Sequence, residues 1–303
     1  MKYMCVSIGL LASAMLATAQ SQFTYVSGTG SNSGGCLRPN PCRDFFYAIG
    51  QTNAGGTVKV VDAGDFAGFE ITKSLTIDGS GFASLTSPIS FKLTGSEQVV
   101  IRNLNVYPGL GNSNLYVDGI LGFINGTVTV TIEDVNVVSP AGPYNNGISM
   151  ITTIGAPGTP RVFLRNVTCT GGTTGFLAAH AGGGGPGPSI TADRFSAANN
   201  SQYGMWIKDS SLVARDSTLH GNAIAGLSVQ SQGAPTSALI ERSEFSFNGI
   251  GVSASNATVR LADSVVTGNA VGLDNGGTIV SFRTNMIAGN TTDGTPALST
   301  SLK

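Results

Sequence analysis

The sequence is short of charge. Only 11% of its 303 residues are Asp, Glu, Lys or Arg, and 17 acidic residues stand against 16 basic ones. Domains that bind nucleic acid or anionic membranes carry a basic excess, so we expect neither partner. The chain also has only two histidines and four cysteines, and the cysteine spacing resembles no common zinc motif. We therefore expect no metal site and no cofactor.

A long apolar run is also missing. The apolar stretch from residue 4 to about 16 is too short to span a bilayer, which takes about 20 residues. Lys2 precedes it and Ala17-Thr18-Ala19 follows it, as in a secretory signal peptide. We expect residues 1–19 to be removed, leaving an exported monomer in the extracellular space, the periplasm or at the cell surface. An uncleaved anchor is the alternative.

Glycine is what the sequence has in excess, with 42 residues. Such a composition can indicate disorder. Here, however, Val, Ile, Leu and Phe recur regularly among the glycines. Regular recurrence predicts many short strands joined by tight turns.

An internal repeat of 21 to 32 residues runs through the chain. Its first column of apolar or small residues is Ile101, Ile132, Leu164, Ala192, Ala214, Ile240, Leu261 and Phe282. A second column two residues earlier is Val99, Val130, Val162, Ile190, Leu212, Ala238, Val259 and Val280. A third column five residues later is Val106, Val137, Cys169, Ala197, Leu219, Phe245, Val266 and Ile287. The two-residue spacing places the first two columns on one strand face, and Cys169 is predicted to be a buried hydrophobe, not a nucleophile.

Asparagine and glycine mark the turn of the repeat. Eight residues after the first column come Asn200, Asn222, Asn248, Asn269 and Asn290. Asn tolerates the left-handed conformation of a sharp turn, and stacked turns would let each amide bond to the next. Glycines follow at Gly175, Gly204, Gly226, Gly251, Gly272 and Gly294. Since no repeat can bury its apolar face alone, the coils must stack.

The pairs Gly221-Asn222, Gly268-Asn269 and Gly289-Asn290, with their flanking strands, resemble the right-handed parallel β-helix proteins of the pectin-lyase-like superfamily. The resemblance covers residues 55–296 and implies an all-β, single-stranded right-handed solenoid. That superfamily includes lyases, glycosidases, epimerases, phage tailspikes and many non-catalytic surface proteins. The resemblance therefore predicts the fold and leaves the activity open.

Both ends of the solenoid are expected to be distinct from it. Residues 20–54 should hold an initial strand near 23–26 and an amphipathic helix at 43–53. In that helix Phe45, Phe46 and Ile49 are available to cover the first coil, whose core and strand edges would otherwise be exposed. A polar C-terminal tail is expected at 297–303.

Cys36 and Cys42 lie in a Gly/Pro-rich loop between the strand and the helix. In an exported protein such a pair predicts a disulfide. Two free thiols are the alternative.

Two adjacent columns of charge follow the first apolar column. The first charged column is Arg102, Glu133, Arg165, Asp193, Arg215, Glu241, Ala262 and Arg283. The second charged column, one residue later, is Asn103, Asp134, Asn166, Arg194, Asp216, Arg242, Asp263 and Thr284. A catalytic interpretation would pair Asp193 with Asp216 as two carboxylates. The alternation of sign favours cross-coil ion pairs instead, because like charges at strand spacing repel.

The catalytic motifs of the superfamily's enzymes are incomplete here. The G-H-G of polygalacturonases appears only as Leu219-His220-Gly221, and there is no Asp-Asp pair. The W-I-D-H of pectate lyases is matched only in its first two letters, at Trp206-Ile207, and the arginine motif is absent. Catalytic residues stay unassigned, and His220 is interpreted as a solvated turn residue.

One surface patch suits a ligand. Trp206 and Lys208 should face solvent, with His180 nearby from one coil earlier and Tyr144 in the insertion at 139–147. An exposed indole beside Lys and His would suit the apolar face of a pyranose. Alternatively, Trp206 packs beneath the 181–188 loop.

Two functions follow from these observations. The favoured one is a non-catalytic exported β-helix for surface display, adhesion or glycan binding, with a polysaccharide or cell-surface glycan as partner. The alternative is a polysaccharide lyase or glycoside hydrolase whose site lies in the region 100–210.

Overall fold

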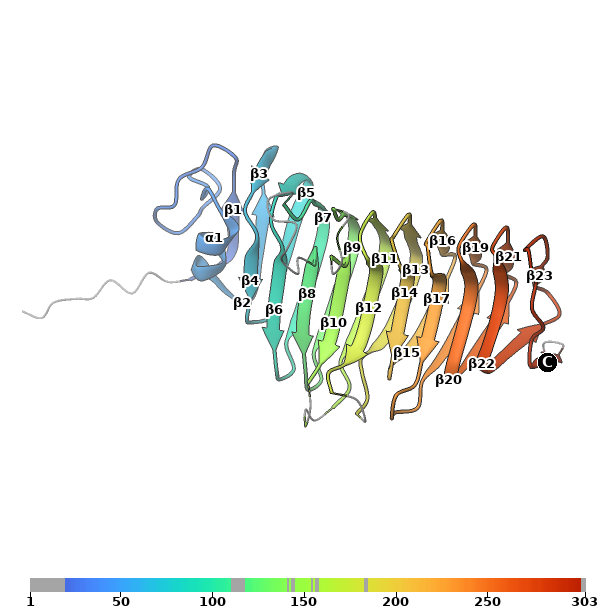
Figure 1. Cartoon of the computed structure of the whole chain (residues 1–303). Coiled ribbons are helices and arrows are strands. Elements are labelled where there is room, and N and C mark those ends of the chain that lie inside the picture. The colour runs from blue at the N-terminus through green and yellow to red at the C-terminus, as the bar shows by residue number, and fades with distance from the viewer. Residues whose placement is uncertain are drawn as a thin grey trace, which may run out of the picture.

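The computed structural model describes residues 20–109, 118–140, 142, 145–153, 155, 158–182 and 185–300. Within them the chain forms a right-handed parallel β-helix whose coils stack along one axis (Figure 1). The predicted signal peptide, 1–19, lies outside the described residues. In the part that the structure describes, no helix is long and apolar enough to cross a membrane.

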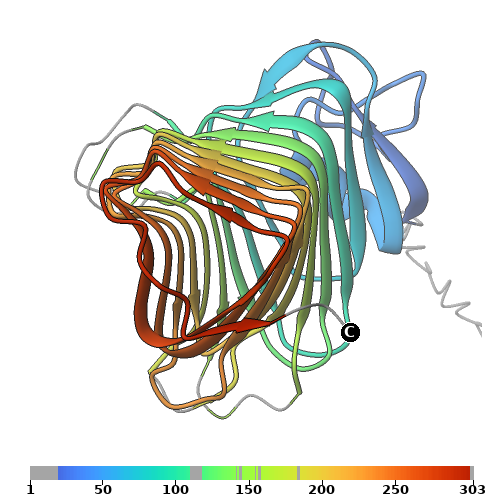
Figure 2. The same cartoon turned by 90° about the vertical axis from the view of Figure 1, so that its right-hand side faces the viewer.

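Each coil contributes strands to three faces, and every strand pairs in parallel with the next coil (Figure 2). The first face holds β2 (Thr52–Val60), β5 (Leu75–Leu85), β7 (Gln98–Val106), β9 (Thr129–Val138), β11 (Arg161–Thr170), β13 (Ser189–Ala198), β15 (Ser211–Arg215), β18 (Ser237–Glu241), β20 (Ile250–Ala262), β22 (Val271–Phe282) and β24 (Leu298–Thr300). The second face holds β3 (Gly64–Phe66), the later halves of β5, β7, β9, β11 and β13, then β16 (Thr218–His220), β19 (Glu244–Ser246), β21 (Val265–Thr267) and β23 (Met286–Ile287). The third face holds β4 (Phe69–Ile71), β6 (Ile89–Leu93), β8 (Ile120–Ile124), β10 (Ile148–Thr152), β12 (Thr174–His180), β14 (Tyr203–Lys208), β17 (Ala225–Gln230) and the earlier halves of β20 and β22.

The three apolar columns form the core. Residues of the third column pair in register from Val106 through Cys169 to Ile287. Cys169 is a free, fully buried thiol, and burial raises its pKa, which leaves it unreactive as a nucleophile.

The last coil departs from the predicted register by one residue. Leu261 pairs with Ser281 and Val259 with Ile279, so the predicted inward residues Val280 and Phe282 are displaced from the core columns. The coil is shortened at Gly277, where a Cβ would lie 2.4 Å from the carbonyl oxygen of Ala257. Because glycine has no Cβ, the corner closes with one residue fewer than in the coil before it.

The corner between the first and second faces is left-handed. Its residues have φ between 47° and 57° and are Asn103, Asp134, Asn166, Arg194, Asp216, Arg242 and Asp263. These belong to the second charged column. Asn and Asp adopt this conformation more readily than other residues with a side chain.

A column of glycines lets consecutive coils approach at the start of the third face. Its members are Gly147, Gly175, Gly204, Gly226, Gly251 and Gly272. A Cβ on any of them would lie 2.5–2.9 Å from a carbonyl oxygen of the following turn. Real side chains do not fit at that distance, so glycine is needed here for close packing.

The N-terminal end is capped by α1 (Phe45–Gln51), where Asp44 accepts a hydrogen bond from the Tyr47 amide (2.8 Å). Phe45 and Ile49 are buried against the first coil, but Phe46 is 75% exposed. The prediction that Phe46 covers the coil was wrong, because residues one apart on a helix point in directions about 100° apart. β1 (Ser21–Val26) pairs with β2 beside the helix.

The loop between β1 and α1 is closed by a disulfide. Cys36 and Cys42 are joined, and both are fully buried. At the opposite end, the predicted polar tail begins with a strand instead. β24 pairs with β22, whose edge groups would otherwise lack backbone partners.

Candidate functional site

An asparagine ladder runs along the turn between the second and third faces. The Nδ2 of each Asn donates to Oδ1 of the next, at 2.8 Å from Asn200 to Asn222, 2.9 Å to Asn248, 3.1 Å to Asn269 and 2.8 Å to Asn290. Each Oδ1 also accepts the backbone N–H of the preceding ladder residue. The ladder therefore ties consecutive turns through both side chain and backbone.

The two ends of the ladder differ. Asn290 donates both its side-chain and backbone N–H to Oδ1 of Asp293, at 2.9 and 3.0 Å. At the first rung, the buried Oδ1 of Asn200 has no hydrogen-bond partner among the described residues. The C-terminal end is thus closed by an acceptor, whereas the N-terminal end has an acceptor unused.

The left-handed residue of this turn stands one position before the ladder residue. Positive φ occurs at Asn199, Gly221, Phe247, Gly268 and Gly289. The prediction that the ladder asparagines adopt this conformation themselves was therefore wrong. Asparagine is needed at the ladder positions for its side-chain hydrogen bonds, whereas the residue before each one adopts the left-handed backbone conformation.

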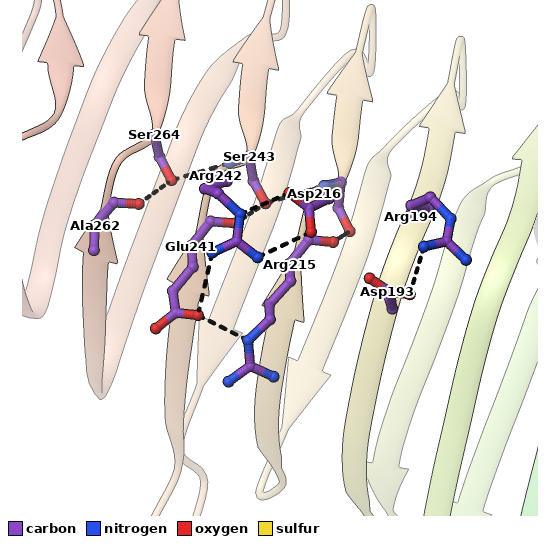
Figure 3. Close-up of polar contacts among 10 residues, drawn as sticks. Asp193, Arg194, Arg215, Asp216, Glu241, Arg242, Ser243, Ala262 and Ser264 are labelled. Carbon is purple, nitrogen blue, oxygen red and sulfur yellow. Dashed lines mark hydrogen bonds and ion pairs between the residues drawn. The ribbon is translucent and has the colours of Figure 1, made fainter.

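The charged columns form ion pairs on the outside of the corner (Figure 3). Arg242 contacts Asp216 at 2.8 Å and Arg215 contacts Glu241 at 2.7 Å, both across coils. Arg194 contacts Asp193 at 2.9 Å within one coil. The hydrogen bond from Arg242 lowers the pKa of Asp216. Asp193 and Asp216 each bind an arginine of their own, so this geometry favours the ion-pair interpretation over a carboxylate pair.

Trp206 lies on the third face between the side chains of Tyr203 and Lys208. The ring of Tyr203 stacks on it with centroids 4.8 Å apart and planes at 27°. Lys208 Nζ lies 4.8 Å from the indole centroid. Trp206 is half-buried, so part of its surface is covered by these neighbours and part faces solvent.

His180, the last residue of β12, is held by contacts with β10 and with the loop that follows it. Its Nδ1 lies 2.9 Å from Oγ1 of Thr152 in β10, whereas Trp206 lies in β14. A Cβ on Gly185 would lie 2.6 Å from the imidazole ring, so the described part of the 181–188 loop rests on His180. These contacts of His180 run toward β10 and the loop, whereas β14, which holds Trp206, pairs with the opposite edge of β12. Tyr144 lies outside the described residues.

A second aromatic–lysine pair occupies the same face three coils earlier. Phe123 of β8 is 38% exposed and stands in register with Lys92 of β6. Both line a cavity of about 440 Å³ that Glu70 and Asn125 also border. The amide of Asn125 is fixed by two 2.9 Å hydrogen bonds with Thr153.

The sequence contained a signal for this pair that our interpretation missed. Lys92 alternates with inward Phe91 and Leu93, as an outward strand residue should. The repeat, however, was aligned on first-face residues, and the insertion at 107–118 precedes β8. The repeat therefore could not predict which residues of neighbouring coils lie beside Phe123.

Apolar residues join the two pairs. Phe123 is in register with Ile151 and Ile151 with Ala179, while Leu177 is in register with Trp206. We call Lys92, Phe123, Ile151, Ala179, Leu177, Trp206 and Lys208 the third-face strip. From β8 to β14 is three coil steps, or about 14 Å at about 4.8 Å per step.

Asp118 lies at the edge of this face, two residues before β8. Burial raises its pKa, even though Ser149 and Asn146 hydrogen-bond to the carboxyl. The Asn146 amide donates to its Oδ1 at 2.9 Å. A carboxyl group held in this way keeps its proton to higher pH than an exposed one. Among the described residues, no three or more His, Cys, Asp or Glu side chains gather as a metal site.

No protein-family model and no curated protein matches the sequence. Several solved structures resemble the fold, among them the following two. The A-module of mannuronan C-5 epimerase AlgE4 from Azotobacter vinelandii superposes with a TM-score of 0.50 and 17% identity, over 93% of this chain and 89% of that chain. Pectate lyase Pel9A superposes with a TM-score of 0.54 and 16% identity, over 93% of this chain and 79% of that chain. The chain therefore shares the right-handed parallel β-helix fold of these two proteins.

Proposed function

We propose that the protein is an exported β-helix that binds an acidic polysaccharide along the third-face strip. The observation that carries this proposal is that two aromatic side chains on one outward face each stand beside a lysine. Aromatic rings suit the apolar face of a pyranose, and an ammonium group attracts a carboxylate on the sugar. An extended chain lying along the helix axis would contact both pairs.

The composition of the strip supports a bound polymer. Ile151, Ala179 and Leu177 between the two pairs add apolar contact without charge. The two structural neighbours have names that refer to mannuronan and to pectate, which agrees with a glycan partner. Export, with action outside the cytoplasm, rests on the signal-like residues 1–19.

The binding proposal is tested by affinity electrophoresis in gels containing alginate or polygalacturonate. Phe123→Ala and Trp206→Ala should each weaken binding about tenfold, which corresponds to about 1.4 kcal/mol. Lys92→Ala should weaken it mainly at low salt, because exposed charges are screened. Phe163→Ala is the matched control, since Phe163 is 39% exposed but lies on the first face. Equal losses in Phe163→Ala, or no retardation of the natural protein, would refute the proposal.

Asp118 favours a second candidate function, cleavage or epimerisation of the bound polymer. A carboxyl whose pKa is raised by burial is suited to general acid–base catalysis. The test is to incubate the protein with alginate and polygalacturonate and to follow ultraviolet absorbance of unsaturated products, reducing ends and the uronate composition. Activity that Asp118→Asn abolishes, with binding intact, would establish an enzyme. No change in the polymer would leave the binding function alone.

A further inference from the structure

Phe247 is the one bulky residue at the left-handed position of the turn that carries the described asparagine ladder. The other residues at the left-handed position are asparagine or glycine, at Asn199, Gly221, Gly268 and Gly289. Phe247 adopts φ 55° with a bulky aromatic side chain, a conformation that is an outlier for such a residue. The side chain is also 66% exposed, so burial does not compensate for the strain. Residues held in this way cluster at functional sites.

The surroundings of Phe247 leave its ring accessible. The equivalent position of the coil before is Gly221 and that of the coil after is Gly268. A Cβ on Gly268 would lie 3.0 Å from the ring, so the ring lies over a residue without a side chain. His220 meets it edge to face, with centroids 5.4 Å apart and planes at 69°.

A chain of hydrogen bonds orients His220. Ser246 Oγ donates to Oε1 of Glu244 at 2.7 Å and lies 3.2 Å from Nδ1 of His220. Ser246 has one hydroxyl proton, which goes to the carboxylate. Nδ1 of His220 must therefore donate to Oγ, and in the neutral imidazole Nε2 carries the lone pair.

The charges beside this cluster favour an uncharged ligand over an acidic one. Glu244 is exposed and carries a carboxylate. Arg242, two residues before Glu244 in the sequence, forms ion pairs with Asp216 at 2.8 Å and with Glu241 at 4.0 Å. A uronate carboxylate placed beside Glu244 would meet like charge, and Arg242 is already engaged by two carboxylates.

We propose that Phe247, His220 and Glu244 form a binding site for an uncharged pyranose. The ring of Phe247 stacks against the apolar face of the sugar. Nε2 of His220 and the second carboxylate oxygen of Glu244 accept hydrogen bonds from its hydroxyl groups. The site belongs to the second face and the adjoining turn, and it does not depend on the third-face strip.

The substitution Phe247→Asn tests the site, because asparagine occupies the same position at Asn199. The probes are galactomannan, xyloglucan and hydroxyethylcellulose in affinity gels. The natural protein should be retarded by at least one of them, and Phe247→Asn should lose at least nine-tenths of that retardation. Its thermal unfolding midpoint should stay the same or rise, since backbone strain is relieved. Phe46→Ala, which removes a 75% exposed Phe at the far end, should bind normally.

Three outcomes would overturn the site: retention of binding by Phe247→Asn, a lower unfolding midpoint, or no retardation of the natural protein by any of the three polymers. Alginate binding keeps this test separate from the proposed function. Phe247→Asn should bind alginate as the natural protein does, whatever the fate of the third-face strip.

A spectroscopic test addresses His220 directly. The chain has two histidines, so ¹⁵N-histidine labelling gives two imidazole signal sets, with His180 as the internal reference. At pH 8 His220 should show protonated Nδ1 and unprotonated Nε2. The polymer that retards the protein should shift the His220 signals and leave those of His180 unchanged. The opposite tautomer, or a shift confined to His180, would contradict the proposal.

Discussion

At the scale of the residue, the asparagines in the middle of the ladder make more hydrogen bonds than Asn200 at its first rung. Asn248 accepts from Asn222 and donates to Asn269 and to the Leu219 carbonyl. Asn200 donates to Asn222, but within the part of the chain that the structure describes its own Oδ1 accepts no hydrogen bond. The same residue type therefore contributes differently to stability at the two positions.

We expect Asn248→Ala to lower the free energy of unfolding by about 2–3 kcal/mol, because the backbone N–H of Asn222 and one of its two Nδ2 hydrogens lose their acceptor, while Nδ2 keeps only the Ala197 carbonyl. Asn200→Ala should cost about 1 kcal/mol, since it leaves no donor unpaired. Urea denaturation of both variants measures the difference. Equal losses would show that the ladder stabilises through volume and not through its hydrogen bonds.

Asp78 gives the molecule an acid-sensitive contact. Burial opposes its ionisation, but hydrogen bonds from Asn103 and Ser80 and the charge of Arg102 lower its pKa on balance. A lowered pKa means that the stabilisation is present above the unfolded-state pKa of about 3.9 and is lost as pH falls through the folded-state value.

The difference in unfolding free energy between the natural protein and Asp78→Asn should therefore be constant above pH of about 5 and shrink below about 4. Urea titrations at a series of pH values check this. A difference that persists unchanged to pH 2 would mean that the carboxylate charge contributes nothing.

At the scale of the element, the short helix α1 stabilises the N-terminal end through one face only. Phe45 packs against Phe66 and Phe69, with centroids 5.3 and 4.7 Å apart. Lys73 Nζ donates to the carbonyl of Ile49 in the last turn (2.9 Å), where the helix has carbonyl groups without partners.

Phe45→Ala should destabilise the protein by about 3–4 kcal/mol, because it opens a cavity at the end of the core. Phe46→Ala, one residue on, should change stability by less than about 0.5 kcal/mol. Thermal or urea unfolding of the two variants compares the faces of the helix. A large loss at Phe46 would contradict the orientation of α1.

The glycine column offers a comparable test between coils. Gly204→Ala would place a Cβ 2.6 Å from the Gly226 carbonyl oxygen, so it should cost about 2–3 kcal/mol. Gly50→Ala, in α1 with open space around it, should stabilise the protein by about 0.5–1 kcal/mol. Similar small effects at both sites would mean that the coils can separate without penalty.

At the scale of the whole molecule, the repeat was sufficient to predict the fold, because inward residues, asparagines and glycines recur with the coil. The left-handed position was misplaced by one residue, since spacing alone does not reveal φ. The register of the last coil failed at Gly277, where a glycine shortens a corner. Insertions hid Phe123 from the repeat, and the contacts of His180 with Thr152 and Gly185 were not predicted, because both partners lie outside the repeat's aligned columns.

Asp293 has a consequence for growth of the solenoid beyond one molecule. Each ladder asparagine donates a side-chain hydrogen bond to the next one toward the C-terminus. An asparagine at position 293 would therefore present unpaired N–H groups to a coil of another molecule. Asp293 accepts both donors of Asn290 and, as a carboxylate, has none to pass on. Those hydrogen bonds also lower its pKa, so it stays ionised in mild acid. We therefore expect Asp293 to oppose end-to-end association of the solenoids.

Asp293→Asn restores an unused donor at the end of the ladder, and we expect this variant to form end-to-end oligomers at neutral pH. The natural protein should begin to do so only in acid strong enough to protonate Asp293. Light scattering and size-exclusion chromatography over a concentration series would detect them, with Asp274→Asn as the control for loss of a charge on the neighbouring coil. If both variants stay monomeric at every concentration, the last rung has no part in keeping the molecules apart.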